Sequence, residues 1–318
     1  MILVTGATGF IGRHLVQRLA DDGYPVRVLL PPTNRVVKAP WAGKVPIVHG
    51  SIHNAESLHQ AMSGIHTVFH MASAQWWGRR RDLERIDLQG TSNVITAARS
   101  ARIGRLEIVS HLGAAPSSAY LLMRIKGQVE ELVRTSGLAY TIFRSGVVFG
   151  PEDSFVNGIA MLLRANPLIF LQPGSGDALL HPIFINDLIE VLIRSMEHLD
   201  SVDQTLEIGG PEYVTFNEMT RTVMRVTQAQ RMLVGIPPYL MRTLTELINR
   251  VVPHWPMTPQ WLDILATNRT ASLSNVPNIF GVRPARFEDT LVTYMPTRHY
   301  LPELARTLLR SRPRYQQA

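Results

Sequence analysis

A glycine-rich turn between an apolar segment and a helical segment constrains the fold of this chain more than any other feature. The turn reads TGATGFIG over residues 5–12 and directly follows the apolar run that starts at Ile2. The next segment, Phe10–Ala20, has apolar residues at helical spacing. Glycines three residues apart let backbone N–H groups approach a diphosphate, and the positive end of the helix dipole then faces it. This strand–turn–helix context predicts a nucleotide-binding βαβ unit.

The rest of the first half alternates expected strands with expected helices. The strands expected after the first are Pro25–Leu30, Val45–His49, Thr67–His70, Leu106–Ser110 and Tyr140–Arg144. The helices expected between them are Ala55–Met62, Leu83–Ala101 and Leu122–Thr135. This rhythm predicts an α/β fold, a Rossmann-like, doubly wound parallel sheet.

After Gly150 the rhythm breaks and helices outnumber strands. The helices expected there are Asn186–Glu197, Phe216–Thr227 behind a Thr215/Glu218 capping box, Tyr239–Val252 and Leu301–Leu309. We therefore expect a nucleotide-binding domain over residues 1–150. A smaller, mostly helical region over residues 151–318 is expected to bind a substrate or partner.

Composition excludes several classes of site. The chain has no cysteine, which excludes disulfides, thiolate metal ligands and a cysteine nucleophile. No metal site is expected. No apolar run reaches the roughly 18 residues of a membrane-spanning helix. Because a strand begins at once, no signal peptide is expected, and the predicted location is the cytoplasm.

The charge is unevenly distributed along the chain. The net charge is +7, and Arg231–Ala318 holds eleven arginines, no lysine and five acids. Two apolar stripes flanked by arginines lie in this region, one in Tyr239–Val252 and one in Leu301–Leu309. A basic amphipathic helix fits an anionic membrane surface or an acidic protein, whereas packing on the chain's own core is the alternative. A nucleic-acid-binding module is not recognisable.

Several further motifs resemble the short-chain dehydrogenase/reductase superfamily, in its extended, epimerase/dehydratase-like branch. These are Gly50-Ser51, His70-Met71-Ala72-Ser73, the segment DLQGTSNV over 87–94, the segment RSGVVFGP over 144–151, and PIFINDL over 182–188. Together with the TGxxGxxG turn they run from residue 2 to about residue 210. The resemblance implies a nicotinamide dinucleotide as cofactor. The residues that it assigns to the cofactor are Gly6, Thr8, Gly9, Phe10, Ile11, Gly12, Arg13, Arg35, Ser51, Ile52, Met71, Ala72, Ser73, Ser110, Lys126, Arg144, Gly146 and Val147.

The end of the second expected strand favours NADP(H), with NAD(H) as the alternative. NAD-preferring sites place an acid there to bind the ribose 2′-hydroxyl, but this strand ends in Leu30-Pro31. Arg13 follows the last glycine of the turn and Arg35 lies just beyond the strand. Both side chains are suited to bidentate hydrogen bonds with a 2′-phosphate.

The catalytic signature of the superfamily, Tyr-x-x-x-Lys, is incomplete. Lys126 has the expected surroundings, but Leu122 occupies the tyrosine position. Tyr120 lies six residues before the lysine, on a different helical face if the segment is helical, and His111 is the other candidate acid. A structural role for His111 is the alternative. An intact helix through residues 120–126 argues against catalysis by Tyr120. An irregular segment there would allow Tyr120 to reach the nicotinamide and act as the acid.

One subgroup fits these departures. The segments SHLGA over 110–114 and FGPEDSFVN over 149–157 resemble atypical members related to the nucleotide-binding accessory subunit of respiratory complex I. That resemblance implies a cofactor-holding scaffold, sensor or accessory subunit. The competing hypothesis is an NADP(H)-dependent oxidoreductase or epimerase that acts on a small or lipid-like substrate, with Tyr120 or His111 as acid and Lys126 as orienting residue.

Overall fold

The computed structural model describes residues 1–32, 39–76, 79–252 and 254–309. The chain divides into two compact units, which are described separately. Unit 1 contains Met1–Ser145 and Leu188–Glu207 among the described residues, and unit 2 contains Gly146–Asp187 and residues 208–309. The chain thus returns to unit 1 after its first passage through unit 2.

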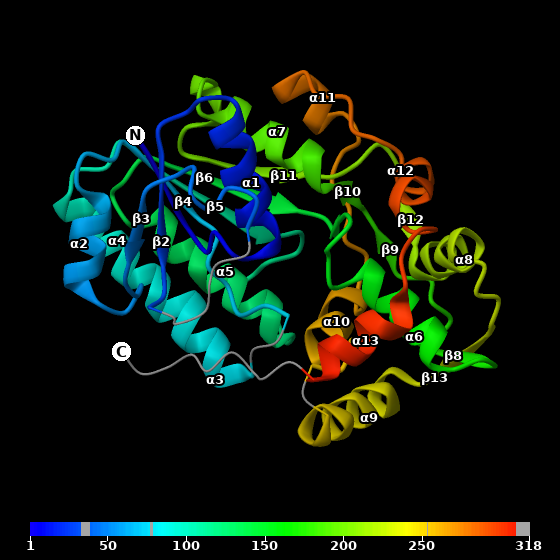
Figure 1. The fold of residues 1–318 in the computed structure, drawn as a ribbon. Helices are drawn as coiled ribbons and strands as arrows, with labels where there is room; N and C mark the ends of the chain where they lie inside the picture. Colours follow the sequence, from blue (N-terminus) through cyan, green and yellow to red (C-terminus); the bar gives the residue numbers. More distant parts are fainter. Residues whose placement is uncertain (33–38, 77–78, 253, 310–318) are drawn as a thin grey trace. The chain divides into compact units, whose positions relative to one another are not determined.

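Unit 1 is built on a seven-stranded sheet with the order β11-β6-β5-β4-β1-β2-β3 (Figure 1). Its strands are β1 (Ile2–Thr5), β2 (Val26–Leu30), β3 (Ile47–His49), β4 (Thr67–His70), β5 (Arg105–His111), β6 (Tyr140–Ser145) and β11 (Gln204–Ile208). The pairings from β3 across to β6 are all parallel. The predicted Rossmann-like sheet is confirmed, and the strand order reverses between β1 and β4, where open α/β sheets bind their ligands.

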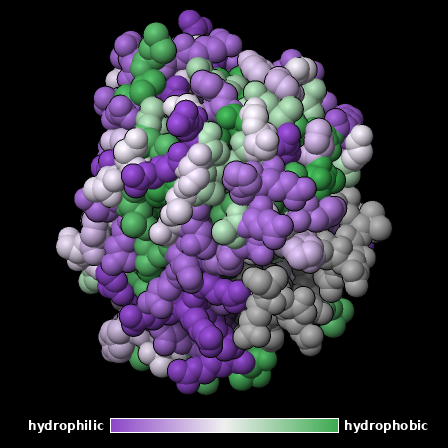
Figure 2. All heavy atoms as spheres, turned by 90° about the vertical axis from the view of Figure 1, so that its left-hand side faces the viewer, coloured by the Kyte–Doolittle hydropathy of each residue, from purple (hydrophilic) through white to green (hydrophobic). Residues whose placement is uncertain are grey.

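Helices cover both faces of this sheet. They are α1 (Phe10–Asp21), α2 (Ala55–Met62), α3 (Arg80–Leu83), the π-helical segment η1 (Glu84–Gln89), α4 (Gly90–Ser100), α5 (Leu121–Arg134), most of α7 (Ile185–Ser195), and the short 3₁₀ turn η2 (Leu199–Ser201). Side chains of α2, α4 and α5 pack with β1, β4, β5 and β6 in one apolar cluster that includes Leu58, Val94, Val129 and Ile142. Figure 2 shows that the outer face on the α2 side is mostly hydrophilic, as expected for a helix layer that faces solvent.

The helix predicted at Leu83–Ala101 is interrupted by the π-helical turn η1. Each residue of a π-helix advances less around the axis than in an α-helix, and such turns are frequent at functional sites. Here η1 contains Asp87, which is almost wholly buried.

Unit 2 combines three two-stranded sheets with helices. Its strands are β7 (Val148–Phe149), β8 (Ile169–Pro173), β9 (Leu179–Leu180), β10 (Ile183–Phe184), β12 (Val214–Thr215) and β13 (Met232–Ile236). Its helices are α6 (Val156–Ala165), α8 (Phe216–Thr227), α9 (Pro238–Val251), α10 (Pro259–Leu265), α11 (Asn275–Phe280), α12 (Phe287–Tyr294) and α13 (Tyr300–Leu309). The predicted Thr215/Glu218 capping box begins α8. An aromatic contact between Phe155 and Trp261, with ring centroids 4.4 Å apart, lies in the core of this unit.

Candidate functional site

The glycine-rich turn has the geometry that a bound diphosphate requires. Gly6 has φ +71°, and a Cβ at this position would lie 2.5 Å from the Met71–Ala72 peptide. A Cβ at Gly12 would lie 2.2 Å from the Gly6 carbonyl oxygen, so α1 and the turn are in close contact. Glycine at both positions is therefore required by packing.

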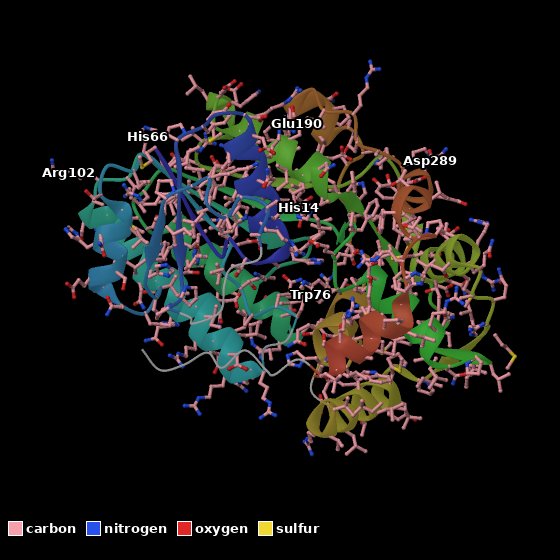
Figure 3. All side chains as sticks on the ribbon, in the orientation of Figure 1. His14, His66, Trp76, Arg102, Glu190 and Asp289 are labelled. Atoms are coloured by element: carbon pink, nitrogen blue, oxygen red, sulfur yellow. The ribbon has the colours of Figure 1, made fainter. Side chains whose placement is uncertain are left out.

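The N-terminus of α1 is open to an anion. Gly9 is its N-cap residue, no side chain caps the helix, and the first turn contains no acid. Thr8 and Gly9 are exposed, whereas Phe10 and Ile11 are half-buried. His14, labelled in Figure 3, donates from Nδ1 to the Phe10 carbonyl at 2.8 Å and steadies the first turn. The turn at Gly6 and Gly9 and the exposed N-terminus of α1 together form a diphosphate cradle, which fits the diphosphate of a dinucleotide.

The loops expected to bind the nucleotide follow the carboxyl ends of parallel strands and therefore share one edge of the sheet. Met71, Ala72 and Ser73 follow β4, and Ser51 and Ile52 follow β3. Asn93 on α4 donates to the Ile52 carbonyl at 3.1 Å, which holds the latter loop.

Arg13 lies half-buried on the first turn of α1, with its guanidinium carbon 5.9 Å from the centre of the Phe10 ring. Pro31 and Pro32 at the end of β2 are exposed. The end of this strand therefore offers no carboxylate to a ribose 2′-hydroxyl. Arg35, the second predicted phosphate ligand, lies outside the described residues.

His70 connects β1, β4 and α4 beneath the nucleotide loop. Its Nδ1 is 2.6 Å from Thr5 Oγ1 and its Nε2 is 3.1 Å from Thr91 Oγ1. Because Thr91 donates its hydroxyl proton to the Asp87 carbonyl, Nε2 of His70 donates to Thr91 and Nδ1 accepts from Thr5. Burial lowers the pKa of His70 to about 4, so the ring is neutral at physiological pH.

Lys126 reaches the same edge from α5. Its Nζ lies 3.1 Å from Ser73 Oγ and 3.1 Å from Asp87 Oδ1. Asp87 also accepts from the Ser73 hydroxyl at 2.7 Å and from the Ala74 N–H at 2.9 Å. Asp87 is thus a buried partner of two expected site residues, Ser73 and Lys126, and the sequence did not single it out. Its only signal was that an acid occupies the first position of the DLQGTSNV segment.

Two expected cofactor residues, Ser110 and Arg144, and the candidate acid His111 are engaged in structural contacts. Ser110 at the end of β5 donates to Glu130 Oε1 at 2.6 Å. The fully buried Glu130 also pairs with Arg144 and Arg134, each at 2.7 Å. His111 is buried, and its Nδ1 donates to the Leu112 carbonyl at 3.0 Å. Arg144, which was expected at the cofactor, therefore forms an ion pair with Glu130.

The segment around Tyr120 is neither an intact helix over residues 120–126 nor an irregular segment throughout. Helix α5 begins at Leu121, and Tyr120 is its N-cap residue with extended backbone, φ −85° and ψ 124°. Leu122, at the tyrosine position, is fully buried in the first turn. The helix therefore runs intact from residue 121 to Lys126, and Tyr120 lies outside it, half-buried.

Gly146 and Val147, the last predicted cofactor residues, begin unit 2 and are buried there. The Gly146 N–H donates to the Ile208 carbonyl at 3.0 Å, and the Val147 carbonyl accepts from the Ile183 N–H at 2.9 Å. A Cβ at Gly146 would overlap the His181 carbonyl oxygen.

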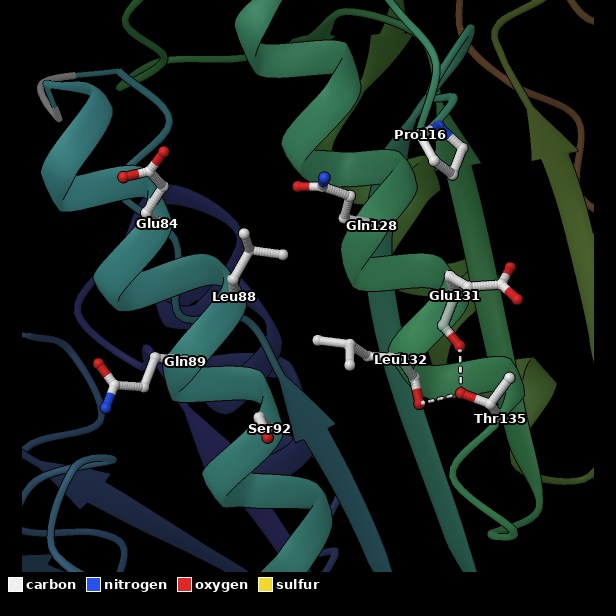
Figure 4. Close-up of a pocket in the computed structure, with 9 residues that line it drawn as sticks. All are labelled: Glu84, Leu88, Gln89, Ser92, Pro116, Gln128, Glu131, Leu132 and Thr135. Carbon is white, nitrogen blue, oxygen red and sulfur yellow. Dashed lines mark hydrogen bonds between the residues drawn. The ribbon is translucent and has the colours of Figure 1, made fainter.

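A separate groove of about 580 Å³ lies between η1–α4 and α5 (Figure 4). Leu88, Pro116 and Leu132 form its apolar part, and Glu84, Glu131 and other polar side chains complete its lining. None of the predicted site residues lines it. The groove is therefore distinct from the strand-end site.

Comparison with known proteins identifies a nucleotide-binding domain in the first half of the chain. Residues 6–154 match the family model described as NAD(P)H-binding. The chain is 23% identical over 259 residues to the mitochondrial NADH-ubiquinone oxidoreductase 40 kDa subunit of Neurospora crassa, covering 80% of this chain and 67% of that protein. It is 26% identical over 289 residues to the ceramide reductase of Caulobacter vibrioides, covering 90% and 83%. It is 35% identical over 147 residues to the photosystem II assembly factor Ycf39 of Cyanophora paradoxa, covering 45% and 44%.

Solved structures show the same fold. An NADPH-dependent quinone oxidoreductase of Escherichia coli, solved with NADPH, superposes with a TM-score of 0.71 at 16% identity and covers 92% of this chain and 99% of that one. A UDP-glucose 4-epimerase of Thermotoga maritima superposes with a TM-score of 0.70 at 18% identity, with coverage of 97% and 99%. The resemblance drawn from the sequence motifs is confirmed: the chain has an NAD(P)H-binding domain and the fold of reductases and epimerases.

Proposed function

Because residues 6–154 form an NAD(P)H-binding domain, we propose that this protein holds NADP(H) without ordinary dehydrogenase turnover. It serves as a scaffold, sensor, or assembly or accessory subunit. Residues 1–150 hold the nucleotide, and residues 151–318 meet the partner.

One observation carries this proposal: the tyrosine of the catalytic signature is absent, and its lysine and a neighbouring cofactor residue are engaged in structural contacts. The tyrosine position is the buried Leu122, which has no proton to donate. Ser110 donates to Glu130, and Lys126 is paired with Asp87. The diphosphate cradle at Gly6 and Gly9 is complete. A site that has the nucleotide-binding turn but no general acid is suited to hold the nucleotide and not to catalyse hydride transfer.

The cofactor is NADP(H) rather than NAD(H) in this proposal. Arg13 beside the diphosphate cradle supplies a guanidinium that a 2′-phosphate accepts in a bidentate manner. Leu30 and the prolines after it provide no carboxylate to repel that phosphate.

The proposed partner is anionic, an acidic protein or a membrane surface, because the last quarter of the chain is strongly basic. The proposed location is cytoplasmic, on the cytoplasmic face of a membrane. Among the described residues no helix is long and apolar enough to cross a bilayer. Two of the relatives are named as a respiratory-enzyme subunit and an assembly factor, which supports a protein partner for this chain.

The nucleotide that co-purifies with the full chain tests the proposal. We expect mass spectrometry of the denatured protein to identify NADP⁺ or NADPH in stoichiometric amount. Recovery of no nucleotide, together with no measurable affinity for NADPH or NADH, would contradict the proposed cofactor-holding function.

A second candidate function is reduction of a lipid-like substrate. It is favoured by the match to a ceramide reductase over 90% of this chain. It is also favoured by the position of Tyr120 outside α5, because the direction of its side chain is then not set by the helix that carries Lys126. NADPH oxidation that depends on added long-chain ketone and is lost in Tyr120→Phe would establish this function. Equal rates with and without that lipid would remove it.

A further inference from the structure

Helix α9 is amphipathic, but its apolar side faces solvent. Leu240, Leu244, Leu247 and Val251 recur at helical spacing and therefore form one stripe. They are 49%, 38%, 57% and 75% exposed. The alternative considered from sequence, that this stripe packs on the chain's own core, is therefore wrong for α9.

The opposite, more polar side of α9 is the side that is fastened to unit 2. Arg242 pairs with the buried Asp263 of α10 at 2.5 Å. Asn249 donates to the Met257 carbonyl at 2.9 Å, and Met241 and Thr245 are buried on this side. These contacts fix the rotation of the helix about its axis. The outward direction of the leucines is thus built into the structure.

Large apolar side chains exposed singly are normal on a protein surface, whereas a contiguous row marks an interaction site. Val292 on α12 is an example of the single kind, at 51% exposure. The α9 row is continuous over three turns and has Tyr239, 70% exposed, at its N-terminal end. Aromatic side chains with a polar tip are enriched at the membrane–water interface.

The basic sequence on either side of α9 favours an anionic occupant. Residues 219–287 contain eight arginines and two acids, Glu246 and Asp263, and two of the arginines, Arg225 and Arg286, pair with Glu288 and Glu212 outside this range. Asp263 is buried and paired with Arg242, so Glu246 is the exposed acid of this stretch. Arg250 is exposed on the flank of the apolar stripe. A basic surface with an apolar ridge is the pattern of helices that lie in the headgroup region of anionic bilayers.

The size of the stripe disfavours a second copy of the chain. A stable dimer buries roughly 800 Å² on each partner, which one row of four side chains on a single helix does not supply. A bilayer accepts such a narrow row, because its headgroups also contact Arg250 on the flank of the row.

We propose that α9 docks this protein on an anionic lipid bilayer, with Leu240, Leu244, Leu247 and Val251 inserted at the boundary between headgroups and acyl chains. This docking surface lies in unit 2 and is independent of the nucleotide site. The proposed cofactor-holding function can therefore fail while the docking stands, and the reverse also holds.

Flotation of the NADPH-loaded full chain with vesicles tests the proposal. We expect flotation with phosphatidylcholine/phosphatidylglycerol vesicles and much less with phosphatidylcholine alone. The variant Leu244→Gln/Leu247→Gln should lose at least tenfold in the vesicle partition coefficient, and its NADPH affinity should be unchanged. Val292→Gln, which removes a comparably exposed apolar side chain of the same unit, should float like the wild type.

Insertion is read out separately by a fluorescent probe, since the natural chain has no cysteine. An environment-sensitive dye on Leu247→Cys should brighten and shift to the blue with anionic vesicles, and the same dye on Val292→Cys should not. Equal flotation of the α9 double variant and the wild type would overturn the proposal. A dimer that dissociates in that variant, without vesicle binding by the wild type, would overturn it in favour of a second copy.

Discussion

Lys126 and Asp87 form a buried ion pair, with Nζ 3.1 Å from Oδ1. Their side chains are 7% and 1% exposed, and the pair joins α5 to the π-helical turn η1. Ser73 hydrogen-bonds to both, so the loop after β4 is held by the same group. The lysine that the sequence resemblance assigns to the cofactor thus has a fixed carboxylate partner.

Breaking this pair on one side should destabilise the protein strongly. Asp87→Asn leaves the ammonium of Lys126 buried beside a neutral amide, and we expect a loss of about 3–5 kcal/mol in the free energy of unfolding, measured with urea. Asp87→Asn/Lys126→Met should recover much of that loss, because no charge is then left unpaired. Asp21→Asn, which removes the exposed partner of Lys44, is the control and should change little. Additive losses in the Asp87/Lys126 double variant would contradict the pairing.

A methyl group at Gly6 should abolish nucleotide binding. Gly6→Ala puts a Cβ 2.5 Å from the Met71–Ala72 peptide and forces alanine into φ +71°. Gly64 has the same φ with open space around it, so Gly64→Ala carries the backbone strain alone. We expect calorimetry to show at least a hundredfold loss of NADPH affinity in Gly6→Ala and wild-type affinity in Gly64→Ala. Similar affinities in the two variants would show that the close approach does not matter.

Arg13 should account for a preference for NADPH over NADH. A charge-assisted hydrogen bond to the 2′-phosphate contributes about 1.5–3 kcal/mol, so the wild type should bind NADPH more tightly by that amount. Arg13→Ala should narrow the gap, and Arg99→Ala on the exposed surface of α4 should keep it. Equal wild-type affinities for the two nucleotides would show that Arg13 and the end of β2 do not select the 2′-phosphate.

His70 should make the protein acid-sensitive between about pH 6.5 and pH 4. The unfolded chain takes up a proton at His70 below its ordinary pKa of 6.5, whereas the folded chain resists protonation until about pH 4. Stability from this group is therefore complete above pH 6.5 and falls as the pH drops, by at most about 3 kcal/mol. Glu107, whose pKa burial raises to about 7, gives the opposite slope over an overlapping range.

The measurement is therefore a difference. The contribution of Glu107 is the same in the wild type and in His70→Asn, so it cancels in the difference between their free energies of unfolding. This difference, wild type minus His70→Asn, should decrease from pH 6.5 to pH 4. A difference that stays constant over this range would show that His70 titrates normally in the folded protein.

Much of the fold could be predicted because short apolar runs bounded by turn residues specify parallel strands. The bounds of α2, β4 and α8 agree with the sequence prediction. The π-helical turn at Glu84–Gln89 was not predictable, since its apolar spacing is compatible with an uninterrupted helix.

The missed parts of the site depend on tertiary contacts. Asp87 and Lys126 meet across 39 residues of sequence, and no local pattern indicates such a pairing. For α9 the periodicity gives the stripe but not its direction, which the Arg242–Asp263 pair decides.

The central claim, cofactor binding without turnover, is tested most directly by the fate of bound NADPH. The full chain is loaded with stoichiometric NADPH, and the absorbance of the reduced nicotinamide is followed with and without a panel of ketone and lipid-ketone acceptors, in the wild type and in Tyr120→Phe. We expect tightly bound NADPH that stays reduced in both proteins, since Leu122 supplies no general acid. Oxidation of NADPH by an acceptor in the wild type, lost by a factor of roughly 10² or more in Tyr120→Phe, would contradict it and make Tyr120 the catalytic acid.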